Sequence, residues 1–383
     1  MKTLTATAFK RRCIAAAHGA AVIVALLCAL AVPSVRAGPA QGREAGEPHR
    51  KHAAARAARG ESTPAYGARA DVLALATDIA ERQPSLGLER VQAVLAEARF
   101  IPGVARRIAP PAEDNVKNWA AYRARFIEPV RVAAGVAFWR DNERWLREAE
   151  TRWGVPAQIV AGIVGVETIY GRQMGNFRVI DALATLSFDF PIEQARRDRS
   201  PYFRGELEQF LVLCQAQGLD PLEPLGSYAG AIGMPQFMPT SWLQYAVDFD
   251  ADGKTDLHTS AADVIGSVAR YLAEFGWQPD LPTHYAVAVP SDPEQRETLL
   301  GPDIFPSFQP EQLGELGAVL EPRGREHPGP LALVMLYNGK AEPSYVAGTR
   351  NFYAITRYNQ SSYYAMAVIE LGSAVAAVVN ATR

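Results

Sequence analysis

Apolar residues recur at three- and four-residue spacing along most of the chain after residue 68. This spacing gathers apolar side chains on one face of an α-helix. The segments that show it are DVLALATDIAERQ (71–83), LERVQAVLAEARF (88–100), FWRDNERWLREAETRWG (138–154), FRGELEQFLVLCQAQGL (203–219), SAADVIGSVARYLAEFGW (260–277) and YYAMAVIELGSAVAAVV (363–379). The pattern predicts a mainly α fold, with Ser260 as the N-cap of its helix.

Two segments favour other local structure. THYAVAVP (283–290) alternates weakly between apolar and polar residues and predicts a short strand. Residues 290–330 are rich in Pro and Gly and predict a small irregular subdomain. We find no internal repeat, so residues 68–383 are interpreted as one domain with additional helical and small irregular subdomains.

The first 37 residues have the organisation of an export signal. Basic residues precede the apolar run AAVIVALLCALAV (20–32), and VRA supplies a small-residue cleavage site. An uncleaved signal that stays as an anchor is the alternative, although the run is short for a membrane span of about 20 residues. Cys28 follows Leu27, where a lipoprotein signal needs a small residue, so we expect no lipid anchor. The expected location is the periplasm.

A linker and the charge balance narrow the class of protein further. Residues 38–67 mix Gly, Pro, Ala and charges with almost no large apolar residue, which predicts a flexible linker. Removal of residues 1–37 takes away five basic and no acidic residues and leaves 34 basic against 41 acidic ones, or −7. This balance argues against a nucleic-acid partner. Only Cys214 remains outside the signal, so no internal disulfide is expected.

The apolar stretch VPAQIVAGIVGVETIYG (155–171) carries a glutamate, Glu167, near its end. On a helix, this glutamate shares a face with Ile163 and Val164. Apolar surroundings disfavour the ionised carboxylate and raise its pKa, so that it can hold a proton near neutral pH and act as a general acid. The alternative is a structural glutamate that turns outward or pairs with Arg172.

Two segments have the composition of a sugar-binding cleft. GSYAGAIGMPQFMPTSW (226–242) combines glycines and prolines with polar and aromatic side chains, and RNFYAITRYNQSSYY (350–364) interleaves tyrosines with amides. Aromatic faces suit the C–H face of a sugar ring, and amides and hydroxyls suit its hydroxyl groups. The alternatives are a turn-rich connection and a Tyr-rich core segment.

The segment DFDADGKTDLHT (248–259) has the spacing of a calcium-binding loop. Its ligand positions 1, 3, 5, 7 and 9 are Asp248, Asp250, Asp252, the carbonyl of Lys254 and Asp256, with Gly253 at the turn position. Thr259 stands where a bidentate glutamate is usual, and Asp263 is the candidate replacement. Because these carboxylates repel one another without a cation, we predict a structural Ca²⁺ site, with a solvated acidic loop as the alternative.

Other catalytic motifs are missing from the sequence. It contains no HExxH, CxxC, P-loop or GxSxG pattern. Zinc, nucleotide and serine-hydrolase chemistry therefore have little support, and no organic cofactor is expected. The glutamate remains the best candidate catalyst.

Several long motifs, in the same order, carry a resemblance to a known family. They are GVETIYGRQMGNFRVIDALATLSFDFP, GSYAGAIGMPQFMPTSW, YAVDFDADGKTDL, IGSVARYLAEFGW and NFYAITRYNQSSYYAMAVIELG. From about residue 70 to the C-terminus, the chain resembles the membrane-bound lytic murein transglycosylase B family, glycoside hydrolase family 103. The resemblance implies a lysozyme-like, mainly helical catalytic domain at 68–383. It also implies cleavage of the β-1,4 bond between N-acetylmuramic acid and N-acetylglucosamine in peptidoglycan, with a 1,6-anhydromuramoyl product.

The resemblance also implies roles for individual residues. Glu167 matches the catalytic acid and base of the family. Glycan-contacting positions are matched by Ser227, Gln236, Tyr271, Tyr358, Asn359 and Tyr364. Phe237 is expected to shape the cleft, and Arg197 and Arg199 are expected to contact peptide stems or carboxylates of the substrate. The calcium loop matches as well.

The expected partners are peptidoglycan glycan strands, acted on by a monomer, with other cell-wall enzymes as candidate partners of the linker. Two alternatives stay open. A hydrolytic muramidase would use Asp181, Asp189 or Glu193 as a second carboxylate. A non-catalytic peptidoglycan-binding protein would keep the cleft and the calcium loop and release no fragments.

Overall fold

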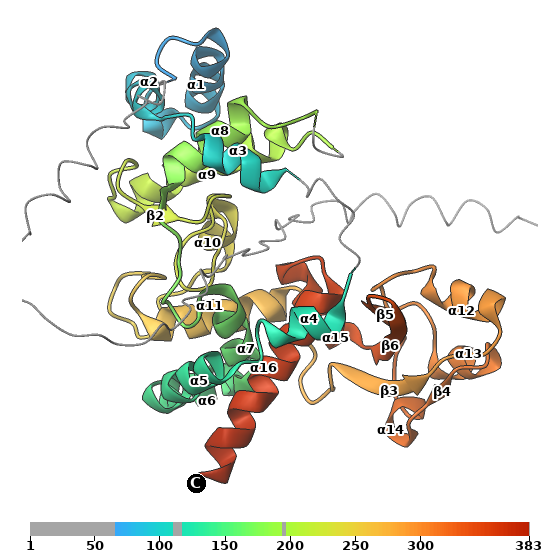
Figure 1. Cartoon of the computed structure of the whole chain (residues 1–383). Helices are drawn as coiled ribbons and strands as arrows, with labels where there is room; N and C mark the ends of the chain where they lie inside the picture. The colour runs from blue at the N-terminus through green and yellow to red at the C-terminus, as the bar shows by residue number, and fades with distance from the viewer. Residues whose placement is uncertain (1–65, 110–116, 194–196, 383) are drawn as a thin grey trace, which may run out of the picture. The chain divides into compact units, whose positions relative to one another are not determined.

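The computed structural model describes residues 66–109, 117–193 and 197–382 and confirms the mainly helical fold (Figure 1). The predicted signal and the predicted linker up to residue 65 lie outside the described residues. The sequence suggested one domain at 68–383, and the described residues group into two compact units. The smaller unit contains 66–109, 175–193 and 197–232, and the larger unit contains 117–174 and 233–382.

The smaller unit consists of helices and one short pair of strands. Its elements are α1 (Ala70–Arg82), η1 (Pro84–Leu86), α2 (Leu88–Glu97), α3 (Pro102–Ile108), β1 (Phe177–Arg178), α8 (Val179–Phe188), α9 (Ser200–Gln217) and β2 (Leu225–Gly226). The strands β1 and β2 pair antiparallel. Tyr66, at the end of the predicted linker, is buried and donates a hydrogen bond to Asp189 at 2.6 Å.

The larger unit contains the remaining elements. Its helical part consists of α4 (Trp119–Ala124), α5 (Pro129–Asp141), α6 (Glu143–Trp153), α7 (Ala157–Thr168), α10 (Pro239–Tyr245), α11 (Ala261–Glu274), α15 (Arg350–Tyr358) and α16 (Ser362–Ala381). The N-cap prediction is confirmed, because the Ser260 side chain accepts a hydrogen bond from the Asp263 amide at the start of α11.

Two glycines bring α7 and α16 together (Figure 1). A Cβ at Gly162 of α7 would lie 2.2 Å from the carbonyl oxygen of Val368, and a Cβ at Gly372 of α16 would lie 2.0 Å from that of Gln158. These contacts show that the helices run antiparallel, since the residue number rises along one as it falls along the other. Each glycine lets a backbone approach that any side chain would prevent.

A four-stranded antiparallel sheet forms the other part of the larger unit. The strand order is β4 (Val319–Leu320), β3 (His284–Ala288), β6 (Ala341–Gly348) and β5 (Ala332–Asn338). The short strand predicted within 283–290 is confirmed as β3. The predicted irregular region 290–330 contains α12 (Pro293–Leu300), α13 (Pro310–Glu315), α14 (Pro322–Arg325) and β4. Its apolar residues, with Tyr285, Leu333 and Ala347 of the sheet and with Leu331 just before β5, form a buried cluster.

The hairpin of β5 and β6 is an element that the sequence analysis did not identify. Asn338 pairs with Ala341, and Gly339 begins the two-residue loop with φ 69°. The loop consists of Gly339 and Lys340, and a glycine at the first position of a two-residue loop between apolar runs is a signal that favours such a hairpin.

Within the described residues, α16 is long and apolar enough to cross a membrane by length and composition. Most of its apolar window is buried inside the structure, as in the core helix of a globular domain.

The glycine contacts generate a test of the α7–α16 packing. Gly372→Ala places a methyl group against the Gln158 carbonyl and is expected to lower the free energy of unfolding by about 1 to 3 kcal/mol. Denaturant unfolding measures this change. Gly205→Ala on α9 is the matched control, since this position is exposed and a Cβ there meets nothing within 4 Å. The substitution should stabilise the helix. An equal effect of both substitutions would contradict the close packing.

Candidate active site

Glu167 lies in the last turn of α7, which is otherwise almost entirely buried. Its side chain is half-buried, and its Oε1 accepts a hydrogen bond of 2.7 Å from the hydroxyl of Tyr364 on α16. The described residues show no ion pair between Glu167 and Arg172, and the carboxyl is hydrogen-bonded to Tyr364 instead. The structure therefore does not show the alternative of a structural glutamate that turns outward or pairs with Arg172.

The surroundings of Glu167 change its acidity in the predicted direction. Burial raises the pKa of its carboxyl to about 7, and the hydrogen bond from Tyr364 acts in the opposite direction because it favours the carboxylate. Burial also raises the pKa of the Tyr364 hydroxyl well above its usual range, so this hydroxyl stays a donor. The carboxyl group is therefore present in both protonation states near neutral pH.

Aromatic rings pack in series next to this pair. The rings of Tyr358 and Tyr364 stack with centroids 6.3 Å apart, and Tyr358 packs against Tyr271 at 4.8 Å and Phe237 at 5.8 Å. Tyr271 is fully buried and donates its hydroxyl to the Arg357 carbonyl, so in this structure it supports the neighbouring rings from behind. Aromatic rings here exclude water from one side of the carboxyl group.

The amide side chains of Gln236 and Asn359 lie in the larger unit, as Glu167 does. Gln236 has a left-handed backbone, with φ 52°, and its Nε2 donates to the carbonyls of Met174 and Gly233. Asn359 is 7% exposed, and its Oδ1 has no hydrogen-bond partner among the described residues. A buried amide oxygen without a hydrogen-bond partner destabilises the folded protein. Such oxygens are common at sites where a ligand supplies the missing hydrogen bond.

The remaining candidate substrate contacts lie in the smaller unit. Ser227 is buried, and its Oγ accepts hydrogen bonds from the amides of Ala229 and Ala231, so it braces its own turn. Arg197 is exposed. The guanidinium of Arg199 stacks over Tyr202 with 5.1 Å to the ring centroid, and burial lowers its pKa.

The candidate second carboxylates of a muramidase are in the smaller unit as well. Both Asp181 oxygens accept hydrogen bonds from the Arg178 guanidinium, and one also accepts from the Arg99 amide. Asp189 accepts from Tyr66 and Arg69. These two carboxylates therefore have structural partners, whereas Glu193 is exposed.

The acidic loop brings three of its carboxylates together. Ligand oxygens of Asp248, Asp250 and Asp252 all lie within 4.8 Å of one another, which suits a Ca²⁺ ion with oxygen ligands at about 2.4 Å. Asp256 is outside this cluster, because it accepts hydrogen bonds from the amides of His258 and Thr259. The oxygens of Asp263, the candidate replacement at position 12, accept from the amides of Phe249 and Asp256 and brace the loop.

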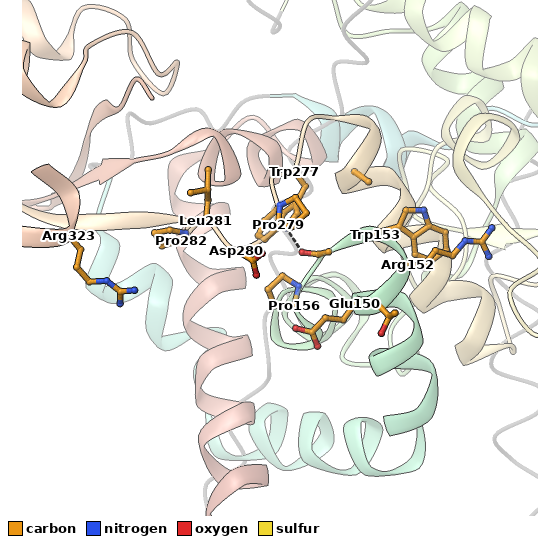
Figure 2. A pocket seen from close by; sticks show the side chains of 13 residues that line it. Glu150, Arg152, Trp153, Pro156, Trp277, Pro279, Asp280, Leu281, Pro282 and Arg323 are labelled. Carbon is orange, nitrogen blue, oxygen red and sulfur yellow. Dashed lines mark hydrogen bonds between the residues drawn. The ribbon is translucent and has the colours of Figure 1, made fainter. Parts of the chain in front are cut away.

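A cavity of about 760 Å³ lies at the other end of α7 (Figure 2). Trp153, Pro156, Trp277 and Arg323 are among its lining residues, and Glu167 is not. Along α7, the carboxyl is about 16 Å from Pro156 at 1.5 Å per residue. Glu167, with its raised pKa and its hydrogen bond from Tyr364, therefore remains the candidate active site, and it lies apart from this cavity.

Sequence reasoning missed residues that fix the end of α7. The Arg131 guanidinium on α5 donates to the Gly165 carbonyl at 2.6 Å. Thr168 donates its hydroxyl to the Met234 carbonyl and accepts from the Gly171 amide. A threonine next to the candidate catalyst was the available signal for the second contact, whereas nothing in the sequence marks Arg131.

Comparisons with known proteins identify the family. The family model described as "Transglycosylase SLT domain" matches residues 72–373. The chain is 40% identical over 299 residues to the membrane-bound lytic murein transglycosylase B of Escherichia coli (strain K12), which covers 75% of this chain and 78% of that protein.

Solved structures of lysozyme-like lytic transglycosylases are similar to most of this chain. The Escherichia coli lytic transglycosylase Slt35 in complex with calcium has a TM-score of 0.72 at 36% identity, over 83% of this chain and 96% of that chain. SltB3 from Pseudomonas aeruginosa in complex with NAG-anhNAM-pentapeptide has a TM-score of 0.63 at 29% identity, over 78% of this chain and 77% of that chain. On this evidence, the chain belongs to the lytic murein transglycosylases, enzymes that act on peptidoglycan and contain the transglycosylase SLT domain.

Proposed function

We propose that this enzyme uses Glu167 as its single acid and base and releases a 1,6-anhydromuramoyl product from peptidoglycan. The observation that carries the proposal is the half-buried Glu167 carboxyl, whose pKa is raised to about 7 and which accepts a hydrogen bond from Tyr364. A group with this pKa gives a proton and later takes one near neutral pH.

The reaction proceeds in two steps. First, protonated Glu167 gives its proton to the 4-oxygen of N-acetylglucosamine, and the bond from this oxygen to the muramoyl anomeric carbon breaks. The substrate's own N-acetyl group stabilises the positive anomeric carbon. Second, the Glu167 carboxylate takes the proton of the muramoyl 6-hydroxyl, whose oxygen bonds to the anomeric carbon. No water is consumed, since the nucleophile is already part of the substrate, and Glu167 regains its proton.

Other residues bind and orient the glycan in this proposal. Tyr358, Tyr364 and Phe237 shape the cleft next to the catalytic carboxyl. The free Oδ1 of Asn359 accepts a hydrogen bond from the acetamido group of the muramoyl ring. Gln236 positions the ring. For the smaller unit the proposal rests on the family resemblance alone, with Ser227 as a glycan contact and with Arg197 and Arg199 as contacts to carboxylates of the peptide stem. Tyr271 acts through Tyr358.

The hydrolytic alternative has less support. A muramidase needs a second carboxylate to serve as base or nucleophile. Asp181 and Asp189 are occupied by arginine partners in the smaller unit, which favours structural roles for both. A non-catalytic binding protein has no need of a half-buried carboxyl with a raised pKa.

We further propose that residues 1–37 direct export to the periplasm and are cleaved off without lipidation, and that residues 38–67 form a linker before the catalytic domain. A monomer acts on glycan strands. NAG-anhNAM-pentapeptide, held by SltB3, supports a glycan with a peptide stem as the ligand class. Other cell-wall enzymes are candidate partners of the linker.

The acidic loop holds a structural Ca²⁺ ion in this proposal. The donor set of Asp248, Asp250 and Asp252 consists of the hard oxygen ligands that Ca²⁺ prefers. The Lys254 carbonyl and Asp256 complete the proposed ligands, with Asp256 through a local change of its present hydrogen bonds. The ion offsets two of the negative charges of the loop and takes no part in the bond-breaking steps. Calcium in the similar Slt35 structure supports the choice of ion.

A pH–rate profile tests the role of Glu167. The carboxyl is protonated below its raised pKa and ionised above it, so kcat/KM is expected to fall about tenfold per pH unit above about pH 7. Tyr364→Phe removes a donor that favours the carboxylate, so the descending limb should move to higher pH. Glu167→Gln should remove activity.

The matched control is Tyr363→Phe. The Tyr363 hydroxyl contacts the backbone of Tyr337 and not Glu167, so its removal should leave the limb in place. A limb that stays at the wild-type pH in Tyr364→Phe, or an active Glu167→Gln, would contradict the proposed acid.

Thermal unfolding tests the calcium site. Saturation at about 100 times the dissociation constant stabilises by about 2.7 kcal/mol, so Ca²⁺ should raise the Tm by about 5 to 10 °C, reversibly with a chelator. Asp250→Asn should weaken this response, because it removes one charge from the cluster. Asp280→Asn, outside the loop, should keep the full response. A Tm that ignores both Ca²⁺ and chelator would refute the site.

A further inference from the structure

Directly after α7, the chain adopts an unusual backbone conformation. Ile169 and Tyr170 both have left-handed backbones, with φ 52° and 56°, although neither is glycine. This region costs about 1 to 3 kcal/mol for each such residue, and a β-branched isoleucine is a rare occupant. Such a turn persists only where surrounding contacts hold it.

The Tyr170 side chain occupies a slot between two helices. A Cβ at Gly135 of α5 or at Gly165 of α7 would lie 2.4 Å from the Tyr170 hydroxyl oxygen. The ring also packs against Phe138, with centroids 5.1 Å apart, and Leu371 of α16 lines the same slot. Both glycines are therefore required to admit this ring.

Packing, and not hydrogen bonding, fixes the ring. The Tyr170 hydroxyl is buried and has no hydrogen-bond partner among the described residues. Burial raises the pKa of this hydroxyl, although nearby Arg131 acts in the opposite direction. The backbone of the turn is tied to α7 instead, since the amides of Ile169 and Tyr170 donate to the carbonyls of Gly165 and Val164.

We propose that Tyr170 is a positioning residue for Glu167. Its ring, locked between Gly135 and Gly165, holds the left-handed turn that ends α7 and thereby keeps the carboxyl against Tyr364. This inference rests on the proposed function of Glu167. The plain alternative is a ring that contributes stability and nothing else.

The two readings differ in their effect on catalysis. A misplacement of about 1 Å at the reacting group can lower the rate about 100-fold, whereas an ordinary core residue lowers stability and leaves kcat unchanged. A loosened turn also lets water reach the Glu167 carboxyl. The titratable groups that face this carboxyl are Tyr364 of α16 and Tyr358 of α15, and Arg131 of α5 donates a hydrogen bond to the backbone of α7. The pKa of the carboxyl should then fall toward that of an ordinary glutamate, because burial affects it more than the hydrogen bond from Tyr364 does.

The experiment compares Tyr170→Ala and Tyr170→Phe in the full chain, with kcat, KM and the pH profile measured on purified peptidoglycan fragments. Tyr170→Ala is expected to lower kcat about 100-fold with little change in KM, and to shift the descending limb to lower pH by about one unit or more. Tyr170→Phe keeps the ring and loses only an unpartnered hydroxyl, so it should keep wild-type kcat and pH profile.

Phe352→Ala is the matched control. It removes a fully buried ring of the same unit, which packs against His284 and Gly348 and not against the turn. It should lower the Tm while kcat and the limb stay as in the wild type. If Tyr170→Ala fails to fold, Tyr170→Leu fills part of the slot and should change kcat and the limb in the same direction.

Two results separate the possible failures. The positioning role would be overturned if Tyr170→Ala or Tyr170→Leu kept the wild-type kcat and descending limb while its Tm fell as in Phe352→Ala. An inactive Glu167→Gln would in that case still support Glu167 as the acid. An active Glu167→Gln would instead overturn the proposed function on which this inference rests.

Discussion

The close antiparallel contact between α7 and α16 is the constraint on which the candidate site depends. Gly372 lies against the Gln158 carbonyl and Gly162 against that of Val368. Further along the same two helices, this register brings Tyr364 to Glu167, 197 residues away in the chain. A larger residue at either glycine would separate the two helices. The Glu167 carboxyl would then move away from the Tyr364 hydroxyl that donates to it.

Within this frame, two opposing effects set the acidity of one carboxyl group. Burial favours the protonated form, and the Tyr364 hydroxyl favours the carboxylate. Their balance leaves a pKa of about 7, which suits the role proposed for this group, first as acid and then as base. The stacked tyrosines keep water away on one side, and the turn after α7 fixes where the carboxyl lies.

The sequence predicted what depends on local pattern. Helical spacing placed Glu167 on an apolar face, the cap at Ser260 was read from residue type, and carboxylate spacing predicted the cluster of Asp248, Asp250 and Asp252. Long-range packing was not accessible in the same way. The family resemblance implied that Tyr271 contacts glycan, whereas in the structure its ring is fully buried and packs against Tyr358, because α11 and α15 pack together. Likewise, no local rule predicts a left-handed Ile169, since only the surrounding slot makes it tolerable.

The central claim is the proposal that Glu167 alone first donates a proton and then accepts one, while the substrate's own 6-hydroxyl replaces water as the nucleophile. Mass spectrometry of the fragments that the mature enzyme releases from purified sacculi, with Glu167→Gln as control, tests this claim most directly. The account predicts muropeptides lighter by one water than the hydrolytic products, and none with the variant. Reducing-end muropeptides released by the wild-type enzyme would contradict it and would require a second carboxylate.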